Sequence, residues 1–316
     1  MMTLLEESLW SSAYGIIAVF VIVGNSLSIY LFVGNLRLRR MRTTILLLNL
    51  SIADLIVGSV TLPMYMALTW PGTNYALQQN PGFYMSFICI DVLTGFGSVF
   101  GLTVIALERV YSVFLPHHHR RAKRKMYLAM IVLIWGLTVI QTLLRVLFDL
   151  EVISLEGFFS CVMISLTVSL IIICVAYIAV WIKVNIKQPR QVNRATLNDH
   201  KTENKLAVTL AIITVIFIFT WIPFHILNIT MFFCVECRSL PIKYVNFFKL
   251  LHYSNSLINP LVYSSRFPEF KRTLKTMFCC QSSAVQPMVS NNMEQSQSHL
   301  SVTPYLRQGR VSIISM

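Results

Sequence analysis

Seven long apolar segments, separated by short polar ones, constrain this chain more than any other feature. A bilayer core about 30 Å thick is crossed by roughly 20 apolar helical residues, and each segment supplies that length with some tilt. The 316 residues are 55% hydrophobic and 12% charged, against about 25% charged in soluble domains. The composition therefore excludes an ordinary soluble globule. The segments are 8–36, 43–69, 83–116, 127–144, 157–182, 206–235 and 244–265.

The fold class predicted from these segments is an all-α membrane protein, a seven-transmembrane helix bundle with a short interfacial amphipathic helix. The end of the chain is rich in Ser, Gln and Asn, a composition that cannot bury a core. We therefore expect a short extracellular N-terminus at 1–9, the bundle at 10–265, the amphipathic helix at 266–280 and a disordered cytoplasmic tail at 281–316.

Basic residues are concentrated in alternate connections, which sets the orientation of the bundle. The positive-inside rule places those connections in the cytoplasm and the N-terminus, with Glu6 and Glu7, outside. We expect a multi-pass protein of the plasma membrane, with an uncleaved first helix. The net charge of +13 then reflects this topology, and the basic residues face anionic membrane lipids. It does not indicate a nucleic-acid-binding protein, because no soluble domain carries it.

Ionisable side chains inside the apolar segments are unusual. Each costs about 2.5–3.5 kcal/mol on insertion scales, so each needs a partner or a function. A polar stripe in the last segment, at Asn255, Asn259 and Tyr263, recurs every four residues and lies on one helix face. Hydrogen bonds between helices, at about 0.6 kcal/mol each, are the alternative explanation for such polar residues. The ionisable residues are Asp54, Asp91, Glu108, Arg109 and Lys249.

Short motifs occur in order, one in each segment. Together they resemble the rhodopsin-like G-protein-coupled receptors over all seven segments and the short segment after them. The motifs are Gly24-Asn25, Leu50-Ser51-Ile52-Ala53-Asp54, Glu108-Arg109-Val110, Trp135, Tyr177, Phe217-x3-Trp221-x-Pro223 and Asn259-Pro260-Leu261-Val262-Tyr263.

The resemblance implies a cell-surface receptor, not an enzyme. Such a receptor binds an extracellular ligand within the bundle and activates a heterotrimeric G protein by movement of the sixth helix. Arrestin and a receptor kinase are expected at the tail. Glu203 matches the acidic partner of Arg109 in receptors that carry an inner-face ion pair. The implied coupling and switch residues are Glu108, Arg109, Tyr177, Glu203, Phe217, Pro223, Asn259, Pro260 and Tyr263.

A sodium site is a second implication of the resemblance. Asp54, Ser98, Asn255 and Asn259 match the positions that hold a hydrated sodium ion in this family, and hard oxygen ligands suit a hard cation. The alternative is an Asp54 that is protonated or hydrogen-bonded without an ion. No covalent cofactor is expected.

The ligand site follows from Asp91, which matches the position where aminergic receptors anchor a protonated amine. Tyr253 matches the tyrosine that often steadies that carboxylate, and Cys161, Ser165, Trp221 and Phe224 are expected to line the same cavity. In the rival interpretation Lys249, one turn outside Tyr253, pairs with Asp91 and neutralises both charges. A paired site would suit a zwitterionic, acidic or lipid ligand better. We expect a small-molecule amine, with a lipid or a short peptide as alternatives.

Departures from the family pattern concern cysteines and one proline. Tyr84 stands where the third helix usually begins with Cys, and Ser169 where the fifth helix usually has Pro, a combination that resembles the melanocortin, cannabinoid and lysophospholipid branch. Cys234 and Cys237 lie in the third outer loop, an oxidising location, and are predicted to form a disulfide. Cys279 and Cys280 close the amphipathic segment and are candidates for palmitoylation.

Two other functions compete with the receptor. A small-solute transporter would show matched internal repeats with broken helices, and the seven segments show no such pairing. A retinal-binding photosensor needs a Schiff-base lysine in the last segment. Lys249 is the candidate, but it lies one turn before the opsin lysine position, where Tyr253 stands.

Overall fold

The computed structural model describes residues 3–186, 194–234, 236–266, 270 and 272, and all of its regular elements are helical. They follow one another along the chain as α1 (Leu4–Gly34), α2 (Leu36–Arg40), α3 (Thr44–Ile56), η1 (Val57–Thr61), α4 (Leu62–Thr69), α5 (Asn74–Gln78), α6 (Pro81–Phe114), α7 (Pro116–Arg121), α8 (Arg124–Asp149), α9 (Leu155–Ile186), α10 (Arg194–Phe233), η2 (Glu236–Ser239) and α11 (Ile242–Arg266).

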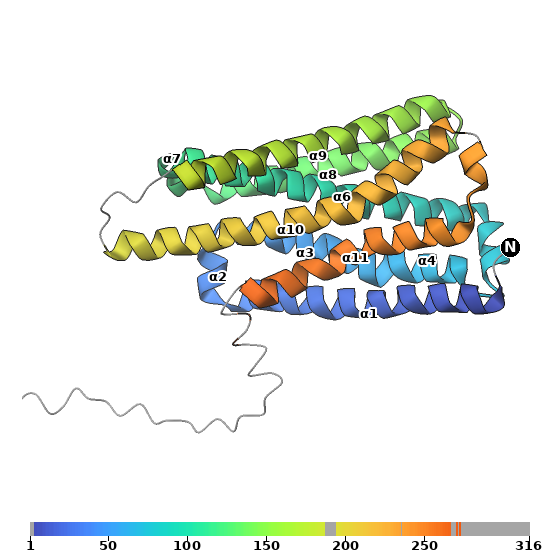
Figure 1. Cartoon of the computed structure of the whole chain (residues 1–316), viewed down its shortest axis with the longest axis horizontal. Helices are drawn as coiled ribbons and strands as arrows, with labels where there is room; N and C mark the ends of the chain where they lie inside the picture. The colour runs from blue at the N-terminus through green and yellow to red at the C-terminus, as the bar shows by residue number, and fades with distance from the viewer. Residues whose placement is uncertain (1–2, 187–193, 235, 267–269, 271, 273–316) are drawn as a thin grey trace, which may run out of the picture.

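The long helices run along one axis, with the N-terminus at one end and α2 and α7 at the other (Figure 1). Six of them, within the described residues, are apolar and long enough to cross a membrane. α11 is the seventh, and it packs against α1 and α10. Its lower hydropathy follows from the polar stripe of Asn255, Asn259 and Tyr263. The seven-helix bundle predicted from the sequence is confirmed.

The outer surface of the bundle is apolar, whereas its interior combines a hydrophobic core with many buried polar side chains. Asn25 and Asn259 are fully buried, whereas Val132 and Phe219 are each more than 70% exposed on the outer surface. Lipid solvates such an outer surface, so the buried hydrogen bonds and close packing between helices hold the bundle together.

A wide helical turn, η1, interrupts the second span between α3 and α4. It lies just before Pro63, which has no N–H to donate to the preceding turn. Gly58 lies in this turn, and a Cβ atom there would come within 2.8 Å of Val21 Cγ1 on α1. Glycine therefore allows the close contact of η1 with α1. Thr61, at the end of the turn, contacts Thr94 on α6 through their hydroxyl oxygens, 3.3 Å apart.

The ends of the helices extend the predicted spans. α1 begins at Leu4, within the segment predicted as the N-terminus, because Thr3 and Glu6 form a capping box. Of the predicted amphipathic helix at 266–280, only Arg266, Phe270 and Arg272 are described, and Phe270 is buried in the bundle core. The tail at 281–316, Cys279 and Cys280 lie outside the described residues.

Candidate functional site

A cavity of about 190 Å³ opens between α6, α9, α10 and α11, in the half of the bundle that contains the N-terminus. We call it the ligand cavity. Its walls are mostly aromatic and aliphatic, with one carboxylate and a few neutral polar groups, as in small-molecule sites generally. The residues that line it are Asp91, Val92, Gly95, Phe96, Phe158, Phe159, Val162, Met163, Leu166, Trp221, Phe224, His225, Asn228 and His252.

Asp91 is the carboxylate of the ligand cavity, and two side chains of α11 contact it. Tyr253 donates a hydrogen bond from its hydroxyl to Asp91 Oδ1 at 2.8 Å. Lys249 Nζ lies 3.4 Å from Asp91 Oδ2. The structure thus brings together three of the residues that the sequence assigned to the ligand site. Asp91 and Lys249 neutralise each other at a depth where an isolated charge would be costly.

The Lys249 ammonium group is enclosed by aromatic rings. Its Nζ lies 4.2 Å from the ring centroid of Tyr65, 4.8 Å from Phe87 and 5.8 Å from Tyr253, within the range of cation–π attraction. Tyr65 is in turn held by α11, because its hydroxyl donates to Asn246 Oδ1 at 2.9 Å.

A second, larger cavity of about 590 Å³, which we call the outer chamber, lies on the other side of Lys249. It is bounded by α1, α4, α5, α6 and α11. Its lining is more polar than that of the ligand cavity, and Lys249 belongs to this lining but not to that of the ligand cavity. The polar side chains in it are Glu7, Tyr65, Thr69, Asn74, Gln78, Tyr84, Asn246 and Lys249.

The predicted lining residues on α9 are placed differently from expectation. Trp221 and Phe224 line the ligand cavity as predicted. Cys161 is exposed, and Ser165 accepts a hydrogen bond from Gln141 Nε2 on α8 at 2.6 Å. Neither lines the cavity, because α9 turns a neighbouring face toward it, with Val162 and Leu166.

His252 is a cavity residue that sequence reasoning missed. Its ring lies 4.2 Å from the Trp221 ring and 5.1 Å from the Phe224 ring, measured between centroids. It follows Lys249 by three residues and so shares its helix face. That spacing was the signal that could have identified it.

A buried polar centre surrounds Asp54, midway along the bundle. The carboxylate is fully buried and accepts hydrogen bonds from Ser98 at 3.3 Å, Ser256 at 2.7 Å and Asn259 Nδ2 at 2.7 Å. Asn255 lies in a small space beside Ser98 and does not bond to Asp54. Ser256, its chain neighbour, makes the direct contact, and no sequence pattern distinguishes Ser256 from Asn255 in this respect.

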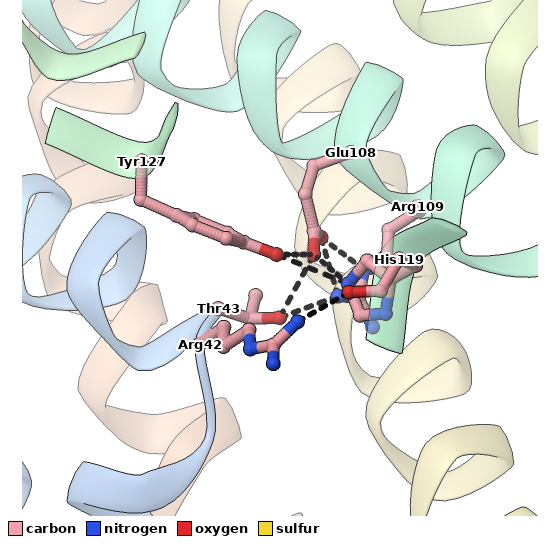
Figure 2. A network of polar contacts seen from close by, with 6 residues as sticks. All are labelled: Arg42, Thr43, Glu108, Arg109, His119 and Tyr127. Atoms are coloured by element: carbon pink, nitrogen blue, oxygen red, sulfur yellow. Dashed lines mark hydrogen bonds and ion pairs between the residues drawn. The ribbon is translucent and has the colours of Figure 1, made fainter. Parts of the chain in front are cut away.

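A charged network closes the opposite end of the bundle and is centred on Glu108, which is fully buried (Figure 2). Arg109 Nε donates to Glu108 Oε2 at 2.7 Å. His119 Nε2 lies 2.8 Å from Glu108 Oε1, and the hydroxyls of Thr43 and Tyr127 each donate to that oxygen at 3.2 Å. The carboxylate therefore connects α6, α7, α8 and the start of α3.

The network also fixes the short helix α7. Arg42 donates from its guanidinium to the backbone carbonyl of His119, and Arg109 donates to the Thr43 hydroxyl. Glu203, the predicted partner of Arg109, has a side chain outside the described part of the chain. Among the described residues, the acidic partner of Arg109 is its chain neighbour Glu108.

The other predicted switch residues lie along α9, α10 and α11. The Phe217 ring contacts the Trp221 ring with centroids 5.4 Å apart, and the Tyr263 ring lies 5.4 Å from Phe32 on α1. Tyr177 packs against the main core cluster. Pro223 and Pro260 lie inside α10 and α11.

A disulfide joins Cys234, which follows α10, to Cys237 in η2, as predicted. It closes a short loop at the end of the bundle that contains the outer chamber. Cys89, Cys161 and Cys174 are free thiols within helices.

The similarity to known proteins covers most of the bundle. A family model described as "7 transmembrane receptor (rhodopsin family)" matches residues 24–263, from within α1 to near the end of α11. The chain is 26% identical over 295 residues to the somatostatin receptor type 2 of Sus scrofa, covering 84% of this chain and 76% of that receptor. It is 24% identical over 317 residues to the adenosine receptor A2a of Homo sapiens, covering 87% and 73%. A stretch of 93 residues, 29% of this chain and 15% of the relative, is 40% identical to the 5-hydroxytryptamine receptor 2B of Drosophila melanogaster.

Proposed function

Because the chain belongs to the rhodopsin family of seven-transmembrane receptors, we propose that its signal begins when a small molecule contacts Asp91 in the ligand cavity. The protein is a receptor that binds an extracellular ligand in its helix bundle and activates a heterotrimeric G protein. It is not an enzyme. We place it in the plasma membrane, with the N-terminus outside and the basic end of the bundle, with α2 and α7, inside.

One observation carries the choice of ligand: a carboxylate, Asp91, lies in an otherwise apolar and aromatic cavity of about 190 Å³. Pockets for drug-sized ligands measure roughly 300–1,000 Å³, so this smaller cavity favours a compact molecule over a peptide or a lipid chain. Asp91 selects a cationic or hydrogen-bond-donating group, and the rings of Phe159, Trp221 and Phe224 select an aromatic or aliphatic body. The relatives named above are receptors for somatostatin, adenosine and 5-hydroxytryptamine, and a compact organic ligand resembles the latter two.

Family membership sets aside the transporter that the sequence left open. The retinal-binding alternative has no support in the cavity, because Lys249 lines the outer chamber and is paired with Asp91. In our proposal the ligand acts on Trp221, which forms part of the cavity wall and contacts Phe217 one turn deeper in α10. Movement of α10 about Pro223 then opens the inner end for the G protein.

The proposal is tested by filling the ligand cavity from Gly95. A Cβ atom at Gly95 would lie 3.6 Å from the Trp221 ring, whereas one at Gly136 on α8 would meet nothing within 4 Å. Gly95→Val should reduce the potency of an agonist, found by a second-messenger screen, by about tenfold or more, since each 1.4 kcal/mol lost is tenfold. Gly136→Val is the matched control and should leave potency unchanged. Equal potency of both variants and the wild type would place the ligand outside this cavity.

A sodium ion at Asp54 is our second proposal for this bundle. The oxygen atoms of Asp54, Ser98, Ser256 and Asn259 are buried together, and such hard ligands suit sodium. Asn259 Oδ1 has no hydrogen-bond partner within the described residues, so one oxygen of the cluster is available as a ligand. The residues therefore fit the ion, which would balance the Asp54 charge in the resting state. Asn255 would act beside Ser98, without a direct bond to Asp54.

Sodium should stabilise the purified receptor more than potassium at equal concentration. An ion that binds only the folded state adds about 2.7 kcal/mol at a hundred times its dissociation constant. The unfolding temperature is the readout, and Asp54→Asn should abolish the difference between the two salts. Asp149→Asn, at the paired Arg145–Asp149 contact outside the centre, serves as the control. A wild-type receptor with the same unfolding temperature in both salts would contradict the ion and leave Asp54 as a hydrogen-bonded residue.

The remaining proposals concern the cytoplasmic tail. Arrestin and a receptor kinase are proposed to act there, and Cys279 and Cys280 to carry palmitate next to the inner leaflet. The resemblance to the melanocortin, cannabinoid and lysophospholipid branch stays a prediction.

A further inference from the structure

The Asp91–Lys249 pair lies between two cavities of different chemistry. Asp91 belongs to the lining of the ligand cavity, and Lys249 belongs to the lining of the outer chamber. Neither side chain is sealed off, because Asp91 is 19% exposed and Lys249 is 12% exposed. Each charge is therefore accessible from its own side.

The pair is looser than an optimal ion pair. The Nζ to Oδ2 distance is 3.4 Å, whereas charge-assisted hydrogen bonds between ammonium and carboxylate groups are about 2.7–2.9 Å long. Asp91 has a closer partner in the Tyr253 hydroxyl at 2.8 Å. Lys249 has three N–H donors, and Asp91 is its one hydrogen-bond acceptor among the residues that the structure describes.

Rings hold the ammonium group in place without using its N–H donors. Tyr65, Phe87 and Tyr253 surround it, and cation–π attraction leaves the N–H groups available to an acceptor. The lining of the outer chamber also includes Asn74 and Tyr84, which can donate hydrogen bonds to an anionic group in the chamber. Glu7 in the first turn of α1 also lines the chamber, and its carboxylate disfavours a ligand group with more than one negative charge.

A ligand with a single charge fits this arrangement poorly. If a simple amine binds Asp91, the ammonium group of Lys249 loses its counter-charge. If a simple acid binds Lys249, the carboxylate of Asp91 loses its counter-charge. An unpaired charge left inside a protein is strongly unfavourable. A ligand that carries both charges replaces both partners of the broken pair.

We propose that the ligand is a compact zwitterion, whose ammonium group binds Asp91 in the ligand cavity and whose singly charged anionic group binds Lys249 from the outer chamber. Lys249 is then a specificity-determining residue, because it distinguishes an amino acid-like ligand from the corresponding amine. The inference rests on the proposed function, since it names the class of molecule that occupies the ligand cavity.

The test uses probes that share a body and differ only in charge. One set is phenethylamine, phenylalanine and 3-phenylpropanoate, and a second is tryptamine, tryptophan and indole-3-propanoate. Each probe is titrated against the purified full-length receptor, with the unfolding temperature as readout. In the wild type, the zwitterion of at least one set should bind about tenfold or more tightly than its amine and its acid, as expected for one added charge-assisted hydrogen bond.

Variants then assign the preference to Lys249. Lys249→Met should remove the advantage of the zwitterion over its amine, and Lys249→Arg should keep it. Lys243→Met, at an exposed residue of the same helix, is the matched control and should behave as the wild type. Because Lys249→Met leaves Asp91 unpaired, the double change Asp91→Asn with Lys249→Met provides a variant without either charge, and it should bind no zwitterion preferentially.

Three outcomes would overturn the inference. If an amine binds the wild type as well as its zwitterion, the zwitterion class is wrong while the ligand cavity of the proposed function stands. If the preference survives Lys249→Met, Lys249 is not its source. If no probe shifts the unfolding temperature, the zwitterion class is rejected, and the effect of Gly95→Val on a screened agonist decides separately whether the cavity itself is wrong.

Discussion

Glu108→Gln should raise agonist-independent signalling by about tenfold or more. Glu108 is fully buried and accepts from Arg109, Thr43 and Tyr127, so its carboxylate holds the inner end of the bundle closed. A glutamine side chain removes the charge and presents an amide N–H₂ group to these donors. Breaking a buried pair from one side costs about 3–5 kcal/mol, and a bias of only about 1.4 kcal/mol between two states is already tenfold.

The measurement is basal nucleotide exchange on a G protein, in membranes matched for receptor at the cell surface. Glu156→Gln is the matched control, because Glu156 is an exposed glutamate at the start of α9. It should leave basal exchange unchanged. Basal exchange in the Glu108 variant equal to that of the wild type would show that the network does not restrain activation.

Arg109→Ala should silence the receptor, even in the Glu108→Gln background. The Arg109 guanidinium is 3% exposed and is bound to Glu108 and Thr43 within the bundle, so the closed state withholds its donors from the cytoplasm. We propose, from the family resemblance, that this arginine acts in G-protein activation and that activation requires its release. Basal nucleotide exchange with the double variant should therefore equal that of membranes without receptor. The tenfold increase caused by Glu108→Gln should be lost completely.

This second experiment needs no agonist, which makes it independent of the ligand proposals. Arg124→Ala in the same background is the control, since Arg124 is exposed at the start of α8, and it should retain the raised exchange. A double variant that remains as active as Glu108→Gln alone would remove Arg109 from the activation step.

His119 illustrates what local pattern analysis cannot detect. His119 is the last of three consecutive histidines on a short connection, and consecutive residues do not share a helix face. In the bundle, α7 directs His119 toward Glu108, and Tyr127 lies 3.1 Å from the same imidazole nitrogen. Glu108 and His119 are only 11 residues apart, but the turn between α6 and α7 decides whether they meet. The angle between α6 and α7 at this turn cannot be predicted from the residue periodicity of either helix.

The sequence by itself determined the number of spans and the helix that carries each motif. These properties are local, because hydropathy depends on about 20 consecutive residues and each motif lies within one span. The orientation, inferred from the basic residues beside each span, stays a prediction. The spacing of Asn255, Asn259 and Tyr263 likewise predicted a polar face on α11, and that face is buried. The cysteine pair at the outer loop was predictable for the same reason, since its members are 3 residues apart.

Only the tertiary structure decided which side chains meet between helices. Lys249 and Asp91 are 158 residues apart, and the sequence left open whether Asp91 faces a ligand or this lysine. Ser256 instead of Asn255 contacts Asp54, and Ser165 bonds to Gln141 on α8 and does not line the ligand cavity. A helical pattern defines which residues share a face, but the rotation of a helix about its axis and its depth relative to its neighbours come from packing the whole bundle. A rotation of one residue, about 100°, is enough to replace one contact by the next.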